Sequence, residues 1–239
     1  MKVLAVIQAR MGSTRLPGKV LMDVAGQPML RRVLERVRRA RSVEGVVVAT
    51  SDREADDAIS GACSDWGIEC QRGSADDVLD RFARVVRMIG PEVVVRVTAD
   101  CPLIDPDVID RVVSTLLCSG ADYVGNVVPP RTFPRGLDVE ALRAHVLLAE
   151  AEENRDPRAR EHVTWGILSA PGRWRVNGVW SESDLSVHRW TVDVAEDLEL
   201  VRSIHGRLGE AFGWRDALAL IEREPELRRL NAHVEQRPV

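Results

Sequence analysis

Short apolar runs alternate with segments of helical periodicity through the first half of the chain. The runs are rich in valine and almost free of polar residues, which is typical of parallel strands buried on both faces. They cover residues 3–7, 45–49 and 93–97. The periodic segments, which place apolar residues on one face of a predicted helix, cover residues 28–41, 53–66, 76–89 and 107–118. This order predicts right-handed βαβ units on a mainly parallel sheet, and therefore an α/β fold.

The regular alternation breaks near Asn126, where several prolines and Gly136 mark a turn-rich insertion. Beyond it we expect a helix over 138–153, strands over 174–180 and 188–192, a helix over 195–208, and a helical C-terminal segment over 210–230 that is interrupted near Pro225. The sequence shows no internal repeat and no low-complexity linker. We therefore expect one domain over residues 1–239, with an inserted arm at about 127–187.

Composition excludes several classes of protein. The 239 residues carry a formal net charge of -4, which argues against a general nucleic-acid binder. The four cysteines form no CxxC pair, which argues against a structural zinc site and suits a reducing cytoplasm. The apolar run at the N-terminus is too short for a signal peptide or a membrane span. We expect a cytoplasmic protein without a membrane partner.

The strongest candidate site is the loop 8–19, with the sequence QARMGSTRLPGK, which begins where the first strand ends. Ligands of open α/β sheets bind at the carboxyl ends of the strands. Small residues let backbone N–H groups approach a ligand here, and Arg10, Arg15 and Lys19 supply the charge density that a triphosphate needs. The spacing fits neither a P-loop nor a GxGxxG motif. The alternative is a solvated basic loop that caps the sheet.

Two carboxylates also follow predicted strands. Asp100 comes after the strand at 93–97, and Asp193 comes after the one at 188–192, so both are candidate Mg²⁺ ligands. Each has a structural alternative, as a helix cap or a strand-end residue; Asp105, before Pro106, suits the capping role of the next helix better than Asp100 does. Asp197 is expected to be solvated or to interact with a helix dipole.

These motifs resemble the cytidylyltransferase family, which includes the acylneuraminate and 3-deoxy-manno-octulosonate cytidylyltransferases. The branch named for a spore coat polysaccharide biosynthesis protein is the most similar. The resemblance runs from Val3 to about Val201. It implies a three-layer, Rossmann-like nucleotide-diphospho-sugar transferase fold with a mainly parallel sheet. It also implies a homodimer built with the inserted arm, and Mg²⁺ held by Asp100 and Asp193.

The resemblance also assigns roles to individual residues. It implies that Arg10, Lys19 and Asp100 are catalytic, with Arg10 and Lys19 on the phosphates. The implied nucleotide-binding residues are Gln8, Ala9, Arg10, Gly12, Ser13, Arg15, Lys19, Arg72, Ser74 and Asp80. The implied acceptor-binding residues are Arg135, Asp138, Glu140, Arg160 and His162. Ser74 is also a predicted helix cap, with Asp77 completing a capping box. The tryptophans of the arm are expected to pack it and its dimer contact.

The function that we expect is transfer of CMP from CTP to a small anionic acceptor, such as a sugar acid, with Mg²⁺ and release of pyrophosphate. Arg10 and Lys19 are expected to be surface-directed. Three alternatives remain: a sugar 1-phosphate nucleotidyltransferase that uses another triphosphate, a nucleotide-sugar-dependent glycosyltransferase, and a non-catalytic nucleotide-binding or assembly protein. Cys101 is not expected to be a nucleophile, because its neighbour Asp100 is acidic.

Overall fold

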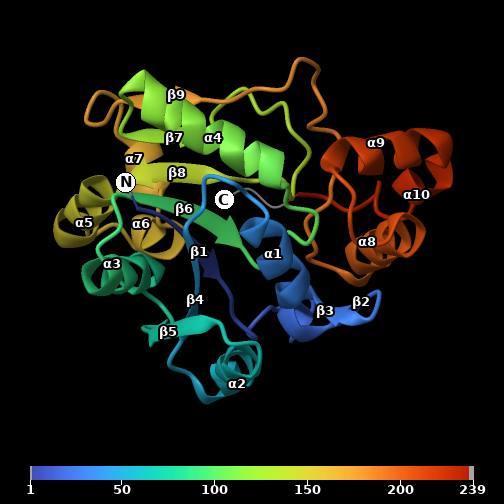
Figure 1. Ribbon diagram of the computed structural model, residues 1–239, viewed down its shortest axis with the longest axis horizontal. Helices are drawn as coiled ribbons and strands as arrows, with labels where there is room; N and C mark the ends of the chain where they lie inside the picture. The colour runs from blue at the N-terminus through green and yellow to red at the C-terminus, as the bar shows by residue number, and fades with distance from the viewer. Residues whose placement is uncertain (1, 237–239) are drawn as a thin grey trace.

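Seven strands pair into one mixed sheet in the computed structural model, which describes residues 2–236 (Figure 1). Their order across the sheet is β5-β4-β1-β6-β8-β7-β9. The strands are β1 (Val3–Gln8), β4 (Gly45–Ser51), β5 (Glu69–Gly73), β6 (Val93–Thr98), β7 (Tyr123–Gly125), β8 (Glu140–Arg143) and β9 (Val176–Gly178). β5, β4, β1 and β6 are parallel, and β8 runs antiparallel to both β6 and β7. The mainly parallel α/β sheet expected from the sequence is confirmed.

Side chains of β1 alternate between two hydrophobic clusters, one on each face of the sheet. Val3, Ala5 and Ile7 pack with α1 (Met29–Arg38) and α4 (Pro106–Ser119). Leu4 and Val6 pack with α3 (Val78–Ile89) and α5 (Ala144–Glu153). Both sets are buried because β1 lies inside the sheet, and this explains why its sequence is apolar at every position. The result is a three-layer arrangement of helix, sheet and helix.

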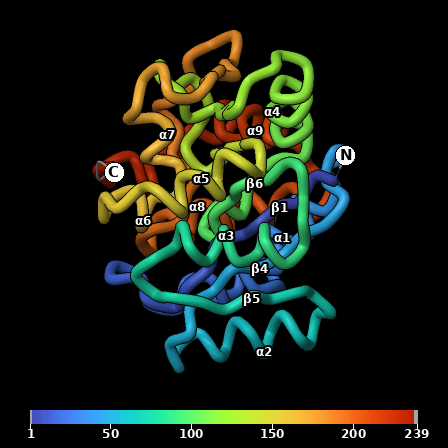
Figure 2. Tube along the Cα trace, turned by 90° about the vertical axis from the view of Figure 1, so that its left-hand side faces the viewer, coloured from blue at the N-terminus to red at the C-terminus, as the bar shows by residue number. Residues whose placement is uncertain are grey.

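The remaining helices complete the two faces. They are η1 (Lys19–Leu21), η2 (Glu54–Asp56), α2 (Asp57–Asp65), α6 (Pro157–His162), α7 (Trp165–Ser169), α8 (Ala195–Leu208), α9 (Trp214–Arg223) and α10 (Pro225–Arg229). Figure 1 shows α8 and α9 together at the right of the view, and Figure 2 shows α2 at the lower end of the molecule, next to β5. A short hairpin of β2 (Asp23–Val24) and β3 (Gln27–Pro28) follows η1. No helix within residues 2–236 is long and apolar enough to span a membrane.

Helix caps agree with the sequence at one position and differ at another. Asp105 caps α4 by accepting a hydrogen bond from Asp107 N at 2.9 Å, as expected. Ser74 does not cap α3. Asp77 does, because its Oδ1 accepts from Asp80 N at 2.9 Å, whereas the Ser74 hydroxyl stabilises the preceding turn by accepting from Asp77 N at 3.1 Å. The predicted capping box, with Ser74 as the cap, is therefore wrong, because the cap of α3 is Asp77, three residues later.

Several boundaries in the second half differ from the sequence prediction. The segment 138–153 is not one helix, because residues 140–143 form β8 and pair with β6 and β7. No strand forms over 188–192; only an isolated bridge joins Arg189 to Arg135. The strand expected at 174–180 is limited to β9. Short apolar stretches do not distinguish strand from helix by periodicity, and the tertiary pairing decides.

The segment 127–187 is tied into the domain through the main sheet. β8 and β9 both lie within it, and each pairs with a sheet strand outside it. α5, α6 and α7 follow β8 and lie along the side of the sheet that α3 covers (Figure 1). The segment therefore supplies strands and helices to the fold.

Gly136 lies against the backbone of Trp190 and Thr191, and a substitution there tests this contact. Its φ is +100°, and a Cβ there would lie 2.5 Å from the backbone of Trp190 and Thr191. We expect Gly136→Ala to lower the free energy of unfolding by about 2–4 kcal/mol, through strain and overlap. Gly206→Ala is the control, because nothing lies within 4 Å of a Cβ in that helix. It should stabilise by up to about 1 kcal/mol. Denaturation at the same urea concentration in both variants would contradict this packing.

Candidate active site

A cavity of about 240 Å³ opens where β1 and β6 end. These strands are parallel neighbours, so the loops that follow them, 8–19 and 98–102, leave the sheet at the same edge. The lining residues are Gln8, Ala9, Arg10, Gly12, Ser13, Thr14, Arg15, Lys19, Val20, Thr98, Ala99, Asp100 and Asp193. The structure thus brings together eight of the twelve residues of the predicted phosphate loop and both predicted metal ligands.

Lys19 occupies the centre of this cavity wall. Its ammonium donates to Asp100 Oδ2 at 2.8 Å, to Asp193 Oδ1 at 2.9 Å and to the carbonyl oxygen of Val192 at 2.8 Å. Only 7% of the residue is exposed, so the expectation that Lys19 is surface-directed is wrong. Burial lowers the pKa of Lys19, but Asp100 and Asp193 more than offset this, and the pKa is raised overall. The lysine is therefore a charged link between the two carboxylates.

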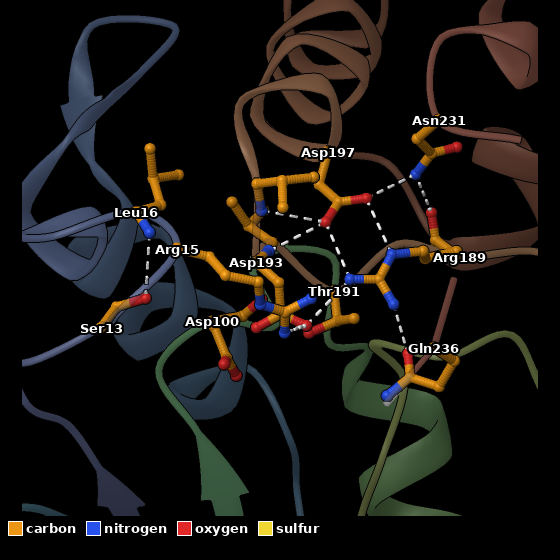
Figure 3. Close-up of polar contacts among 12 residues, drawn as sticks. Ser13, Arg15, Leu16, Asp100, Arg189, Thr191, Asp193, Asp197, Asn231 and Gln236 are labelled. Carbon is orange, nitrogen blue, oxygen red and sulfur yellow. Dashed lines mark hydrogen bonds and ion pairs between the residues drawn. The ribbon is translucent and has the colours of Figure 1, made fainter. Parts of the chain in front are cut away.

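Asp193 is surrounded by cations (Figure 3). Besides Lys19, its Oδ2 contacts Arg15 Nη2 at 3.0 Å and Arg189 Nη2 at 2.8 Å. Burial raises the pKa of Asp193, but Lys19, Arg15 and Arg189 outweigh it, and the pKa is lowered overall. The carboxylate is ionised at neutral pH and held from three sides.

Asp100 is placed by its neighbours in the sequence and by one backbone contact. Its Oδ1 accepts from Thr98 Oγ1 at 2.7 Å. Its carbonyl oxygen accepts from Val192 N at 2.9 Å, which brings the segment before α8 to the end of β6. Burial first, and then Asp100, raise the pKa of the Cys101 thiol well above its usual range. A nucleophilic thiolate is therefore disfavoured there, as expected.

The two carboxylates fit a divalent cation. Asp100 Oδ2 and Asp193 Oδ1 already converge on one cationic atom, Lys19 Nζ, at 2.8 and 2.9 Å. Within residues 2–236, no group of three or more His, Cys, Asp or Glu side chains could hold a metal ion. A metal here would have two protein carboxylates, with phosphate and water oxygens as further ligands, which is the arrangement that Mg²⁺ commonly adopts.

Asp56 fixes the loop 8–19 through a contact that the sequence does not predict. This residue is 3% exposed, and its Oδ1 accepts from Met11 N at 2.7 Å, while its Oδ2 accepts from Ser51 N at 3.2 Å at the end of β4. Ser13 shapes the same loop by accepting from Leu16 N at 3.3 Å. An aspartate within a predicted helix gives no signal of a contact with a loop 45 residues away.

Three predicted nucleotide-binding residues do not line this cavity. Arg72 donates to the carbonyl oxygen of Ser51 at 3.0 Å and pairs with Asp57. Ser74 is used in the turn before α3, and Asp80 pairs with Arg84 at 2.6 Å. All three lie at the ends of β5 and α3, beside the loop but outside the cavity wall.

A second cavity of about 330 Å³ adjoins the first, and Thr98 lines both. Its lining residues are Arg96, Thr98, Val127, Arg131, Asp138, Glu140, His162, Thr164, Trp165 and Leu168. Three of the predicted acceptor-binding residues are among them: Asp138, Glu140 and His162. Arg160 instead pairs with Asp77 at 3.3 Å, and the backbone of Arg135 pairs with that of Trp190.

Paired charges form the floor of the second cavity. Glu140 is buried and accepts from Arg96, from Tyr123 Oη at 2.7 Å and from Thr164 Oγ1 at 2.5 Å. Burial raises its pKa, but Arg96 above all lowers it, and the pKa is lowered overall. Arg131 donates to Asp138 at 2.5 and 3.1 Å. The sequence does carry a signal for Arg96, which is the one charged residue in an otherwise apolar strand.

Comparison with known proteins agrees with this geometry. A family model described as cytidylyltransferase matches residues 4–153. The spore coat polysaccharide biosynthesis protein SpsF of Bacillus subtilis is 32% identical over 94% of this chain and 95% of its own. The structure of a cytidylyltransferase from Leptospira borgpetersenii covers 100% of both chains, with 31% identity and a TM-score of 0.91.

The fold is also shared with a more distant structure. CMP:2-keto-3-deoxy-manno-octonic acid synthetase, solved in complex with CTP, superimposes with a TM-score of 0.65 at 23% identity over 87% of this chain and 99% of that one. The family match places the chain in the nucleotidyltransferase class of enzymes, in agreement with the cavity at the carboxyl edge of its sheet. The chain belongs to the cytidylyltransferase family.

Lys19→Met tests the ammonium at the centre of the site. The free energy of unfolding should fall by about 1.5–3 kcal/mol at neutral pH, the range for hydrogen bonds to charged groups. Because the pKa of Asp193 is lowered in the fold, its ion pairs stabilise the wild type above its ordinary pKa of 3.8 and are lost as the pH falls through the lowered value. The pKa of Lys19 is raised in the fold, so its contribution is fully present below its ordinary pKa of 10.5 and is lost as the pH rises through the raised value.

The difference between wild type and Lys19→Met should therefore be largest at about pH 5–9 and shrink at both extremes, as measured by urea unfolding. Arg41→Met is the matched control, because the Arg41 side chain is 87% exposed in its ion pair with Asp110. Its effect should stay within about 0–1 kcal/mol. Equal losses in the two variants would contradict the central role of the Lys19 ammonium.

Proposed function

We propose that this enzyme transfers CMP from CTP to a small anionic acceptor and releases pyrophosphate. The observation that carries the proposal is the convergence of Asp100 and Asp193 on one cationic point, beside the loop that bears Arg10 and Arg15. Membership of the cytidylyltransferase family supports CTP as the donor. A structure of the same fold was solved with CTP, which supports the cavity as a nucleotide site.

The chain's own residues account for positioning and charge. In the proposed reaction an acceptor oxygen attacks the α-phosphorus of CTP, the bond to the β-phosphate oxygen breaks, and pyrophosphate leaves. Asp100 and Asp193 would hold Mg²⁺, which supplies a positive charge next to the reacting phosphate. Arg10 and the backbone N–H groups of loop 8–19 would meet the phosphate oxygens. Catalysis of this kind depends on orientation and electrostatics.

Lys19 takes a more specific role than a simple phosphate contact. Its three N–H groups are used by Asp100, Asp193 and Val192. A phosphate oxygen therefore reaches this ammonium only by competing with one of these partners. We propose that Lys19 keeps the carboxylates together before nucleotide binds, and that Arg10, which is exposed at the cavity wall, makes the first phosphate contact.

The second cavity is the proposed acceptor site, because it meets the first at Thr98. Its two arginines are paired with two carboxylates, so its net charge is small. Trp165, Leu168 and Val127 add an apolar wall. A doubly charged phosphate group would need an unpaired guanidinium, and both arginines of this cavity are paired with carboxylates. A hydroxylated carboxylic acid, which carries a single charge, therefore suits this lining better. The name of the Bacillus subtilis relative supports a role in polysaccharide precursor synthesis.

The alternatives receive less support. A glycosyltransferase would use a DxD metal motif, and Asp105-Pro106-Asp107 has that spelling. Asp105 is 1% exposed and caps α4, however, so it is not available to a metal. A sugar 1-phosphate nucleotidyltransferase that uses another triphosphate shares the fold, and only the choice of nucleotide and acceptor distinguishes it.

Turnover tests the proposal directly. Pyrophosphate release should be fastest with CTP rather than UTP, GTP or ATP, in a panel of sugar acids, sugar phosphates and phosphonates with Mg²⁺. Asp100→Asn should lower turnover far more than it lowers the melting temperature. Arg10→Ala should lower kcat/KM by about 10- to 100-fold, the loss expected for one charge-assisted contact.

The matched control is Arg53→Ala, which removes an exposed arginine paired with Asp76 outside both cavities. It should keep wild-type rates. Equal rates in Arg10→Ala, Asp100→Asn and Arg53→Ala would rule out the assigned site, and a preference for another triphosphate would favour the first alternative.

We also propose a homodimer formed through the segment 127–187. Among the described residues, the large hydrophobic side chains classed as exposed are Met88, Leu168, Val176, Trp180 and Val187, and all but Met88 lie in or at the end of this segment. Four of these side chains thus share one segment of the chain, and exposed apolar surface often marks an interface. Light scattering should give the mass of a dimer at micromolar concentration, and Trp180→Asp with Val187→Asp should shift it to monomer. A wild-type monomer would refute the dimer.

A further inference from the structure

The C-terminal part of the chain is connected to Asp193 by buried polar contacts (Figure 3). Asp197 is the first of these. It was expected to be solvated or to interact with a helix dipole; it is 0% exposed and lies in the first turn of α8. Its Oδ2 accepts from the backbone N–H of Asp193 at 2.9 Å and of Val194 at 3.2 Å. Asp197 thus fixes the backbone of Asp193 at the start of α8, where a carboxylate is also favoured by the helix dipole.

Arg189 fixes the side chain of the same residue. Its Nε and Nη2 donate to the two carboxylate oxygens of Asp197, both at 2.9 Å, and Nη2 also reaches Asp193 Oδ2 at 2.8 Å. A planar guanidinium that bridges two carboxylates holds them in a fixed relative orientation. Arg189 is 8% exposed, so little water competes for these contacts.

Asn231 closes the network from beyond α10. Its Nδ2 donates to Asp197 Oδ1 at 2.8 Å and to the carbonyl oxygen of Arg189 at 2.9 Å. Asn231 is 4% exposed, and Gln236 further along the chain accepts from Arg189 Nη1. Residues 231 and 236 lie far beyond the 4–153 region that the family model covers. The hydrogen bonds that Asn231 and Gln236 make to Asp197 and Arg189 therefore come from the C-terminal segment and not from loop 8–19 or β6.

We propose that Asn231, Asp197 and Arg189 are positioning residues that orient Asp193 for the metal–nucleotide complex. This gives the C-terminal helical segment a function, because Asn231 can reach Asp197 only if α9 and α10 carry the chain back to α8. The proposal rests on the proposed function, in which Asp193 is a metal ligand. The three residues act through Asp193 and need touch neither the nucleotide nor the metal.

Asn231→Leu tests this in the full chain, because leucine has a similar size and no donor. With CTP present and no acceptor, binding of Mn²⁺ followed by electron paramagnetic resonance of the free ion should weaken about 10-fold, as is typical when an outer-shell partner of a metal ligand is lost. CTP affinity in EDTA should stay unchanged. In turnover, the half-saturating Mg²⁺ concentration should rise by a similar factor while kcat at saturating Mg²⁺ changes little.

Arg207→Ala is the matched control. It removes the 2.6 Å ion pair between Arg207 on α8 and Glu224 before α10, so it loosens the same helices without touching the network. Its Mn²⁺ affinity should equal that of the wild type. Gln236→Ala removes an exposed acceptor of Arg189 and should weaken Mn²⁺ binding in the same direction, even if Asn231→Leu does not fold.

The outcomes separate the two proposals. If Asp193→Asn loses Mn²⁺ binding with CTP but Asn231→Leu and Gln236→Ala bind as the wild type does, the positioning role is refuted and the proposed metal site stands. If Asp193→Asn itself binds Mn²⁺ and CTP as the wild type does, the metal role of Asp193 fails, and the positioning proposal fails with it. Weakened binding in Arg207→Ala would show that general loosening of the helices is the cause, which also refutes the positioning role.

Discussion

The pairing of one buried ammonium with two carboxylates is the interaction on which the site depends. Lys19 comes from the loop after β1, Asp100 from the end of β6, and Asp193 from the segment before α8. Two carboxylates that both lie within 2.9 Å of one atom would repel each other in a partly dry cavity, and each loses hydration on burial. The ammonium cancels the repulsion and offsets the lost hydration, and it joins three segments that are far apart in the sequence.

The same constraint explains the polar residues around the site. Asp193 forms ion pairs with Lys19, Arg15 and Arg189. Arg189 also forms an ion pair with Asp197, and Asp197 accepts a hydrogen bond from Asn231. Each charge in this network therefore has a partner, as the cost of an unpaired buried charge requires. The second cavity follows the same rule with Arg96 and Glu140. A network of this kind is rigid, which suits a reaction whose rate depends on the orientation of its reacting groups.

The sequence predicted those parts of the molecule that local pattern determines. The strands β1, β4 and β6 and helices α1, α3 and α4 are long and periodic, and the loop 8–19 is recognised by its position after the first strand. β8 was predicted as helix because Glu140–Arg143 is short and its strand state comes from β6 and β7 on either side. The segment 188–192, with the sequence HRWTV, does not form the expected strand, since its neighbours leave it only one bridge.

Side-chain contacts across long separations were the parts that sequence could not supply. Asp197 looks like an ordinary acidic residue in a first helical turn, yet it is buried beneath Arg189. Lys19 has the sequence context of a surface cation in a basic loop, yet it is buried because its ammonium donates to Asp100 and Asp193. The roles of Asp56 and Asn231 likewise depend on which segments the fold brings together. Charge and residue type indicated the chemistry of the site, and tertiary structure decided which residues share it.

The most direct test of the central claim is a crystal structure of the protein with CTP and Mn²⁺, located by its anomalous scattering. We expect one anomalous peak bound by Asp100 and Asp193, with the triphosphate along loop 8–19 and the Lys19 ammonium turned away from at least one carboxylate. A peak elsewhere, or CTP bound outside the cavity with Lys19 still between both carboxylates, would contradict it.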